Sequence, residues 1–361
     1  MSLDAMFDKA AASAAPVASI TIRRPDDWHV HLRDGAMLKA VLPFTAAQFA
    51  RGIIMPNLVP PVTTVVMASA YRERILAARP QGSDFQPLMT CYLTDATSPD
   101  EIERGHAEGV WVAAKLYPAG ATTNAHHGVT DIPALAPVLE RMEKIGMPVL
   151  IHGESTDPAI DIFDREAAFM EHSLLPLLKR HPGLKVVIEH ATTAETLDIV
   201  RAHAARAAAT ITPHHLVINR TSIFQGGLQP HLYCLPVAKR ERHRLALRKA
   251  ATSGESCFFI GTDTAPHLRT RKEAECCSAG IFGGATALQT YVQVFDEENA
   301  LDRFETFASL NGARFYGMAP NSGTIRLERR ESRVMPAVAV DDSEVVVFQG
   351  GVTLPWSLAG A

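Results

Sequence analysis

Short apolar runs rich in Val, Ile and Leu recur along the chain from Ile20 onward, and longer segments with helical spacing separate them. Strands that are buried on both faces read as continuous apolar stretches rather than as an alternating pattern. Eight runs fit this description, at residues 28–32, 52–55, 87–92, 112–116, 148–151, 185–188, 208–212 and 257–260. The pattern predicts eight βα units around one parallel sheet.

Helical spacing is clearest at residues 69–78, 132–145, 193–205 and 239–251. No GxGxxG motif follows the first run, so dinucleotide binding is not favoured. Eight alternations fit a closed (β/α)8 TIM-like barrel better than an open sheet. We expect residues 20–361 to form one barrel domain, with the segments after Phe295, including 345–349, packed outside it. We expect residues 1–19 to be an N-terminal extension with little order.

Composition narrows the possible functions. The chain is 47% hydrophobic and 20% charged, which is typical of a globular protein. Its net charge is −4 and it has no Lys/Arg-rich block or long apolar run, so neither nucleic acid nor a membrane is an expected partner. The cysteines are Cys91, Cys234, Cys257, Cys276 and Cys277, without CxxC spacing. A disulfide framework or thiolate zinc site is therefore not expected, and with no export signal we expect a cytoplasmic protein that binds small molecules.

Polar residues that can bind a metal, a proton or a substrate fall at the ends of nearly all the apolar runs. In a barrel these ends converge on one mouth, where the catalytic residues of the fold gather. His29 and His31 lie on the same face of a strand because side chains alternate with a period of two. Nitrogen and oxygen donors of this kind suit zinc, or manganese or cobalt in its place. The set comprises His29, His31, Arg33, Asp34, Asn57, Lys115, His152, His190 and Asp263.

Lys115 does not fit this set as an ammonium, because a cation beside a divalent metal is repelled. One chemical solution is the reaction of the neutral amine with carbon dioxide, which gives an anionic carbamate that can bridge two metals. The alternative is an ordinary lysine that faces solvent at the end of a strand.

Six motifs occur in an order that matches a known family. They are IRRPDDWHVHLRD at 22–34, MPNL at 55–58, AKLYP at 114–118, IHGE at 151–154, IEH at 188–190 and GTDTAPH at 261–267. On these motifs the chain resembles the dihydroorotases of the amidohydrolase superfamily, in particular the shorter bacterial type. The resemblance runs nearly end to end, and it implies a barrel of the metal-dependent hydrolase type.

The resemblance also implies a set of site residues. It implies two zinc ions per chain: His29, His31 and Asp263 hold the more buried ion, His152 and His190 hold the more exposed one, and N6-carboxylated Lys115 bridges both. It implies these substrate contacts: Arg33, Asn57 and His267 with the carboxylate, the backbones of Leu235 and Ala279 with the ring, and Thr122 and Thr123 at the tip of a loop that closes over the ligand.

The reaction that the resemblance implies is the reversible cyclisation of N-carbamoyl-L-aspartate to L-dihydroorotate in de novo pyrimidine biosynthesis. A hydroxide between the two metals would attack the ring amide, and Asp263 would be the catalytic general acid and base. The family also implies a homodimer.

Three other functions stay open. A hydantoinase or dihydropyrimidinase would share the metals, but it would have no use for a carboxylate-binding group formed by Arg33, Asn57 and His267. A mononuclear deaminase would not need Lys115 as a bridge. A metal-free scaffold would keep the barrel and bind a partner protein, which the full set of ligands argues against.

Several other polar residues have plainer interpretations. The pair His126-His127 lies in a loop of small polar residues and is expected at the surface. The pair His214-His215 ends the seventh run and is expected to support or pack against the site. Glu154 and Glu189 adjoin metal-binding histidines, so they either orient imidazoles or face outward. The pair Cys276-Cys277 is expected to be a reduced loop pair near Ala279.

Overall fold

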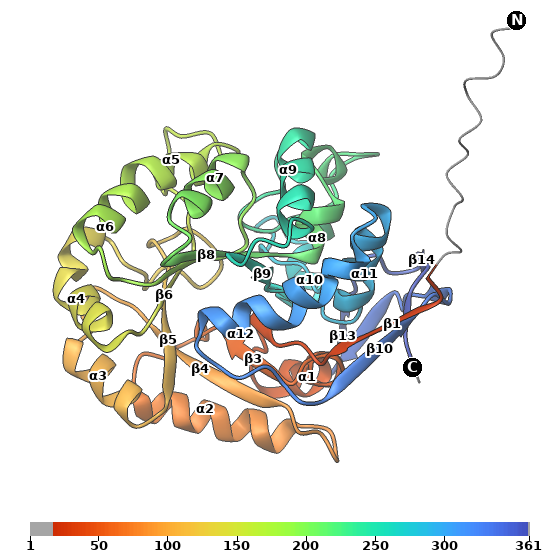
Figure 1. Ribbon diagram of the computed structural model, residues 1–361, viewed down its shortest axis with the longest axis horizontal. Coiled ribbons are helices and arrows are strands. Elements are labelled where there is room, and N and C mark those ends of the chain that lie inside the picture. Colours follow the sequence, from red (N-terminus) through yellow and green to blue (C-terminus); the bar gives the residue numbers. More distant parts are fainter. Residues whose placement is uncertain (1–16, 360–361) are drawn as a thin grey trace, which may run out of the picture.

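A computed structural model describes residues 17–359, and an eight-stranded parallel sheet lies at its centre (Figure 1). The strands pair in chain order: β2 (Asp27–Val30), β3 (Arg51–Ile54), β4 (Gln86–Tyr92), β5 (Trp111–Leu116), β6 (Val149–Ile151), β7 (Val186–Ile188), β8 (Ala207–Ile211) and β9 (Phe258–Ile260). Each predicted apolar run forms one of these strands, with limits within one or two residues of those expected. The prediction of a (β/α)8 barrel is confirmed.

The barrel closes where its first and last strands meet. The backbone N–H of Asp263 donates to the His29 carbonyl at 2.9 Å, and that of His31 donates to the Thr264 carbonyl at 3.1 Å. Residues predicted as metal ligands therefore make the closing hydrogen bonds themselves, and closure fixes the positions of their backbones.

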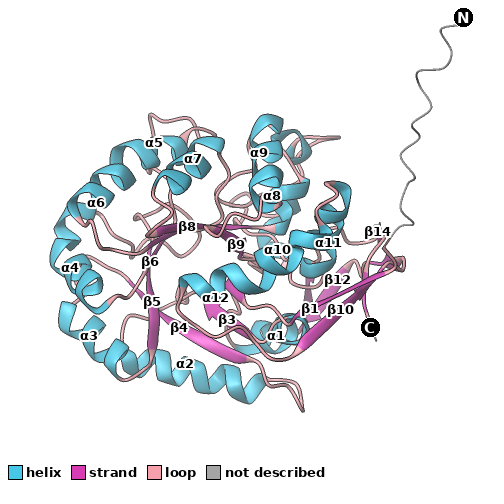
Figure 2. Cartoon of the chain, in the orientation of Figure 1, coloured by secondary structure: helices cyan, strands magenta, loops and turns pink. Residues whose placement is uncertain are grey.

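Helices cover the outside of the strands (Figure 2). Their bounds are α1 (Gly35–Gln48), α2 (Val65–Ala78), α3 (Pro99–Ala107), α4 (Ala136–Ile145), α5 (Arg165–Phe169), α6 (Leu175–Arg180), α7 (Ala194–Ala202), α8 (Pro213–Val217), α9 (Glu241–Ala251), α10 (Arg269–Lys272), α11 (Ala287–Glu297) and α12 (Asn311–Phe315). The helix expected at 69–78 begins earlier because the Thr64 hydroxyl caps it by accepting from the Met67 N–H. The segment expected at 132–145 is a 3₁₀ turn followed by α4.

The packing of Trp28 holds β2 in place next to His29. The Trp28 ring stacks on Tyr316, with the ring centroids 4.6 Å apart. Gly312 lies against the same indole, because a Cβ added there would come within 2.0 Å of the Trp28 Nε1. A bulkier residue at Gly312 would therefore disturb the strand that carries the first candidate ligand.

Small antiparallel sheets lie beside the barrel. In one of them β10 (Thr324–Glu328) lies between β1 (Ser19–Arg23) and β15 (Ser357–Leu358) and pairs with both. The other two pair β11 (Ser332–Arg333) with β14 (Thr353–Leu354) and β12 (Ala337–Val340) with β13 (Ser343–Val346). β1 begins inside the range 1–19 that we expected as an extension, and residues 1–16 lie outside the described part. The segment expected at 345–349 begins in β13. Within residues 17–359, no helix has the length and apolar character that crossing a membrane requires.

Candidate active site

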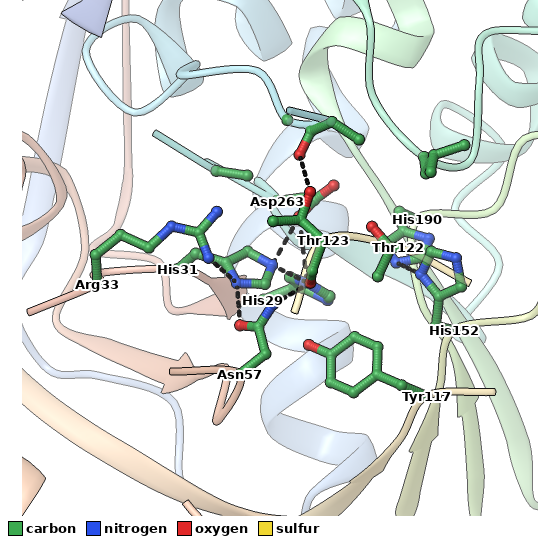
Figure 3. Close-up of a pocket in the computed structure, with 14 residues that line it drawn as sticks. His29, His31, Arg33, Asn57, Tyr117, Thr122, Thr123, His152, His190 and Asp263 are labelled. Carbon is green, nitrogen blue, oxygen red and sulfur yellow. Dashed lines mark hydrogen bonds and ion pairs between the residues drawn. The ribbon is translucent and has the colours of Figure 1, made fainter. Parts of the chain in front are cut away.

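Side chains from several strand ends converge on one pocket (Figure 3). Its lining residues are His29, His31, Arg33, Asn57, Tyr117, Thr122, Thr123, His152, His190, Leu235, Asp263, Ala265, Ala279 and Gly280. Most of the site residues predicted from the sequence are among them. Lys115 and His267 are not: Lys115 is fully buried at the end of β5, and His267 contacts Arg33.

Three predicted ligand atoms from His29, His31 and Asp263 meet in what we call the first cluster. The two histidine Nε2 atoms are 3.2 Å apart, and the Asp263 Oδ1 lies 3.3 Å from that of His29 and 3.1 Å from that of His31. Burial lowers the pKa of His31 to about 3, so its imidazole is neutral and can offer a lone pair. Burial raises the pKa of Asp263, but the close contacts with both histidines outweigh burial and hold that pKa well below its usual range. Ligand atoms at roughly 2.0–2.2 Å from a zinc ion would have this spacing.

Both histidines of the first cluster are held from behind. The Nδ1 of His29 lies 2.8 Å from the Glu189 Oε2, which also accepts from the Thr210 hydroxyl at 2.7 Å. The Nδ1 of His31 lies 2.8 Å from the Asn57 Oδ1. These contacts orient each ring and leave its Nε2 toward the pocket. Glu189 therefore orients an imidazole, which was one of the two alternatives from the sequence.

His152 and His190 form what we call the second pair. The Nδ1 of His152 lies 3.2 Å from the Nε2 of His190, and the Nε2 of His152 lies 2.7 Å from the Glu154 Oε2. Burial and the neighbouring His152 lower the pKa of His190 well below its usual value. His190 has a φ of 42°, an uncommon backbone conformation of the kind found at functional sites. The ring centroids of His190 and His29 are 5.1 Å apart, so the two groups adjoin.

Lys115 is fully buried, and within residues 17–359 its Nζ has no hydrogen-bond partner. It lies 5.0 Å from the centroid of the Tyr117 ring. Burial lowers the pKa of Lys115 to about 8, against the opposing influence of Glu189 and Asp263. A neutral amine is thus accessible near neutral pH, and the neutral amine is the form that reacts with carbon dioxide. The solvent-facing alternative for Lys115 is wrong.

Arg33 lies on the other side of the first cluster from the second pair (Figure 3), and it contacts His267. The Arg33 Nη2 lies 3.1 Å from the His267 Nε2, and the Arg33 Nε donates to the Pro266 carbonyl at 3.2 Å. Burial and the nearby Arg33 lower the pKa of His267 to about 2, so the imidazole is neutral. Arg33 has a φ of 58°, and its carbonyl accepts from the Tyr71 hydroxyl at 2.6 Å. The arrangement offers a fixed guanidinium to an anionic group.

The loop that carries Thr122 and Thr123 lies across the pocket. The Thr123 hydroxyl donates to the Ala279 carbonyl at 3.3 Å, and the Thr123 carbonyl accepts from the Asn57 Nδ2 at 3.3 Å. The Asn124 Nδ2 donates to the Asn57 carbonyl at 3.1 Å. The loop is therefore tied to two residues that were predicted to contact substrate.

Tyr117 lines the pocket, although sequence reasoning gave it no role. Its ring stacks on Tyr92 at a centroid distance of 5.2 Å and lies 6.1 Å from the ring of His152. The alternation of side chains could have identified it, because Tyr117 is two residues beyond Lys115 and therefore on the same side of the chain.

The pair His214-His215 and Cys234 form a third group of buried donors. Both ring nitrogens of His215 have protein partners: the Thr212 hydroxyl at 2.8 Å and the Pro236 carbonyl at 3.0 Å. The Cys234 thiol also donates to that carbonyl, at 3.4 Å. These contacts support the turn next to Leu235, whereas neither ring nitrogen of the buried His214 has a hydrogen-bond partner within the described residues.

Other candidates lie away from the pocket. Asp34 is the N-cap of α1, where it accepts from the Gly35 N–H, and it forms an ion pair with Arg74. It therefore serves a helix terminus and does not line the pocket. The pair His126-His127 is exposed, as expected.

Comparisons with known proteins agree with this geometry. The amidohydrolase family matches residues 22–329. The dihydroorotase of Escherichia fergusonii is 58% identical over 344 residues, which cover 95% of this chain and 99% of that protein. The crystal structure of dihydroorotase from Campylobacter jejuni has a TM-score of 0.87 and 33% identity, and covers 94% of this chain and 97% of that one. The dihydroorotase of Saccharomyces cerevisiae in complex with 5-fluoroorotic acid has a TM-score of 0.87 and 32% identity, and covers 95% of this chain and 98% of that one.

Proposed function

The chain belongs to the amidohydrolase family and, within it, to the dihydroorotases, and we propose that the pocket at the barrel mouth is its catalytic centre. The reaction is the reversible cyclisation of N-carbamoyl-L-aspartate to L-dihydroorotate, with loss of water. One observation supports placing the catalytic centre in this pocket. The first cluster and the second pair meet beside a buried lysine that lacks a hydrogen-bond partner within the described residues.

Two divalent ions, for which we propose zinc, would be held by these groups. His29, His31 and Asp263 would hold one ion and the second pair would hold the other, while Lys115, as a carbamate, would supply oxygen ligands to both. Support comes from the short distances between the donor atoms and from the buried Lys115 amine. Converted to a carbamate, this amine would carry two oxygens that can bind metal. Bound there, the ions would make a water molecule acidic enough to ionise near neutral pH and would polarise the substrate carbonyl.

Asp263 carries the proton in this account. Its low pKa keeps it ionised, and it stands at the junction of β9 and β2 within 3.3 Å of both histidines of its cluster. In hydrolysis it takes a proton from the attacking oxygen and delivers it to the ring nitrogen, and in cyclisation it makes the opposite transfers. One carboxylate serves both directions because the two reactions share a transition state.

The substrate carboxylate lies against Arg33, with Asn57 and His267 beside it. The guanidinium offers two parallel N–H donors, a geometry that matches a carboxylate and that lysine cannot reproduce. The neutral His267 and the Asn57 amide add uncharged polar contacts. The 5-fluoroorotic acid bound by the yeast relative also combines a pyrimidine ring with a carboxylate. The Thr122 and Thr123 loop shields the bound ligand from water.

A comparison of two substrates tests this assignment. Dihydroorotate and dihydrouracil share the ring amide, but only dihydroorotate has a carboxylate. We expect turnover of dihydroorotate to exceed that of dihydrouracil by a wide margin. The opposite preference would support a dihydropyrimidinase, and a folded, metal-loaded protein without hydrolysis of either would support the scaffold.

Residues 20–361 act as one catalytic unit in this proposal, and the chain forms a homodimer in the cytoplasm. All five cysteines are free thiols, and Cys276 is exposed, which suits a reducing compartment. Light scattering on the purified protein tests the dimer.

A further inference from the structure

Lys272, the last residue of α10, has its ammonium group inside the protein, where all three N–H groups donate to backbone carbonyls. The residue is 3% exposed. Its Nζ donates to the carbonyls of Tyr233, Ser278 and Gly280, each at 2.8 Å. An ammonium has three N–H donors, so every proton of Lys272 has a protein partner.

The three carbonyls belong to two chain segments far apart in the sequence. Tyr233 lies two residues before Leu235, whereas Ser278 and Gly280 flank Ala279. A backbone hydrogen bond from the Gly280 N–H to the Tyr233 carbonyl, at 3.0 Å, also joins the segments. Lys272 therefore fastens together the two segments whose backbones are proposed to contact the substrate ring.

The bond to Ser278 also sets the direction of one N–H group. The carbonyl of Ser278 and the N–H of Ala279 belong to the same peptide, and the peptide is trans because the cis bonds lie elsewhere. In a trans peptide the two groups point in opposite directions, so holding the carbonyl toward Lys272 turns the Ala279 N–H away from it. No hydrogen bond within residues 17–359 uses the N–H of Ala279 or of Leu235, and both residues line the pocket.

The segment at Ala279 has little freedom to shift without disturbing the carboxylate side of the pocket. The Ala279 carbonyl lies 3.0 Å from the His267 Nε2. A Cβ added at Gly280 would come within 2.6 Å of the Ala265 carbonyl oxygen and within 2.8 Å of the His267 Cδ2. A loop displaced by loss of Lys272 would therefore alter both the ring contacts and His267.

We propose that Lys272 is a positioning residue for substrate binding, which holds the free backbone N–H of Ala279, and the segment that carries Leu235, in place beside the substrate ring. The proposal rests on the proposed substrate contacts of these two residues. It assigns Lys272 no contact with the metals or the reacting atoms, so its loss acts on the binding of substrate rather than on the chemical step.

The test compares Lys272→Met with Arg271→Met. Arg271 is the exposed neighbour, and its replacement removes the same charge from the same helix. For Lys272→Met we expect KM for dihydroorotate to rise at least about tenfold, kcat to change by less than about threefold, and metal content to stay that of the wild type. The Kd for 5-fluoroorotic acid, measured by calorimetry, should weaken by a similar factor. Arg271→Met should match the wild type in all four measurements.

Lys272→Arg adds a second variant that keeps the charge. A planar guanidinium cannot direct its donors to three carbonyls around one point, so we expect KM between those of the wild type and Lys272→Met. If Lys272→Met does not fold, Lys272→Arg is the test. A raised KM with normal metal content for Lys272→Arg then supports the proposal, and a wild-type KM overturns it.

Two results would overturn the proposal with Lys272→Met in folded form. One is an unchanged KM and Kd, and the other is a fall in kcat together with loss of metal. Arg33→Lys, measured in parallel, separates this failure from failure of the proposed pocket. If Arg33→Lys leaves KM unchanged, the proposed pocket itself is wrong. If KM rises for Arg33→Lys but not for Lys272→Met, the pocket stands and only the role of Lys272 is wrong.

Discussion

The first cluster and the second pair use the same kind of side chain, but the protein supports them differently. In the first cluster both imidazoles have a partner behind them at 2.8 Å, and the backbones of all three residues take part in barrel closure. In the second pair His152 has Glu154 at 2.7 Å, whereas the Nδ1 of His190 has no partner within the described residues. The first cluster is preorganised by the fold, so we expect its ion to be retained more firmly than that of the second pair.

Asp263→Asn should have the largest effect, because the residue belongs to the first cluster and is also the proposed general acid and base. An amide keeps the size of the side chain but loses the charge and the basicity. We expect kcat to fall by on the order of 10⁴-fold, with weaker retention of metal at the first cluster. Steady-state assays with metal analysis check this, and Asp302→Asn on an exposed turn serves as the matched control.

Lys115→Ala tests the residue proposed to join the first cluster and the second pair. Without the bridging carbamate we expect kcat to fall by about 10³-fold and the second pair to lose its ion first. Lys185→Ala, an exposed lysine that precedes β7, should leave both activity and metal content unchanged. Near-normal turnover of Lys115→Ala would contradict the bridge.

Arg33→Lys probes the substrate side of the first cluster and leaves the metal ligands intact. A bidentate contact with a carboxylate becomes a single point charge, so we expect KM for dihydroorotate to rise by about 10- to 100-fold. Metal content should not change. The matched control is Arg72→Lys on the exposed face of α2, and equal KM values for the two variants would show that Arg33 does not bind the carboxylate.

Glu189→Gln and Glu154→Gln are matched variants that compare the first cluster and the second pair directly. Each glutamate is buried, contacts one histidine through Oε2, and has an Oε1 without a partner in the described part of the chain. Each substitution should weaken metal affinity by about 10- to 100-fold. We expect added zinc to restore Glu189→Gln at lower concentration than Glu154→Gln, because Glu154→Gln weakens the pair that already holds its ion less firmly. Identical zinc titrations of the two variants would show that the first cluster and the second pair hold metal equally firmly.

The barrel was predictable because its strands are buried on both faces and read as apolar runs, as at β4 and β5. The small sheets were not, because β11 and β14 have two residues each and show no periodicity. β1 pairs Ser19 with Glu328, a contact that depends on the folded barrel bringing the two ends of the chain together.

The strand-end rule predicted residues that the structure brings together in one pocket, because the carboxyl ends of barrel strands share one mouth. It could not decide the direction of Glu189, whose position after β7 allows either face until the loop is packed. Leu235 and Ala279 offer only backbone groups, so no pattern of side chains could point to them, and they came from the family resemblance. Lys272 was missed for the same reason, because the carbonyls that it binds come together only in the folded chain.

Native mass spectrometry of the active, zinc-loaded protein during graded chelation tests the central claim most directly. We expect two divalent ions and the added mass of one carbon dioxide per chain, located at Lys115 by fragmentation, and then an intermediate that keeps one ion as activity disappears. An active chain that holds a single ion beside an unmodified Lys115 would contradict the account.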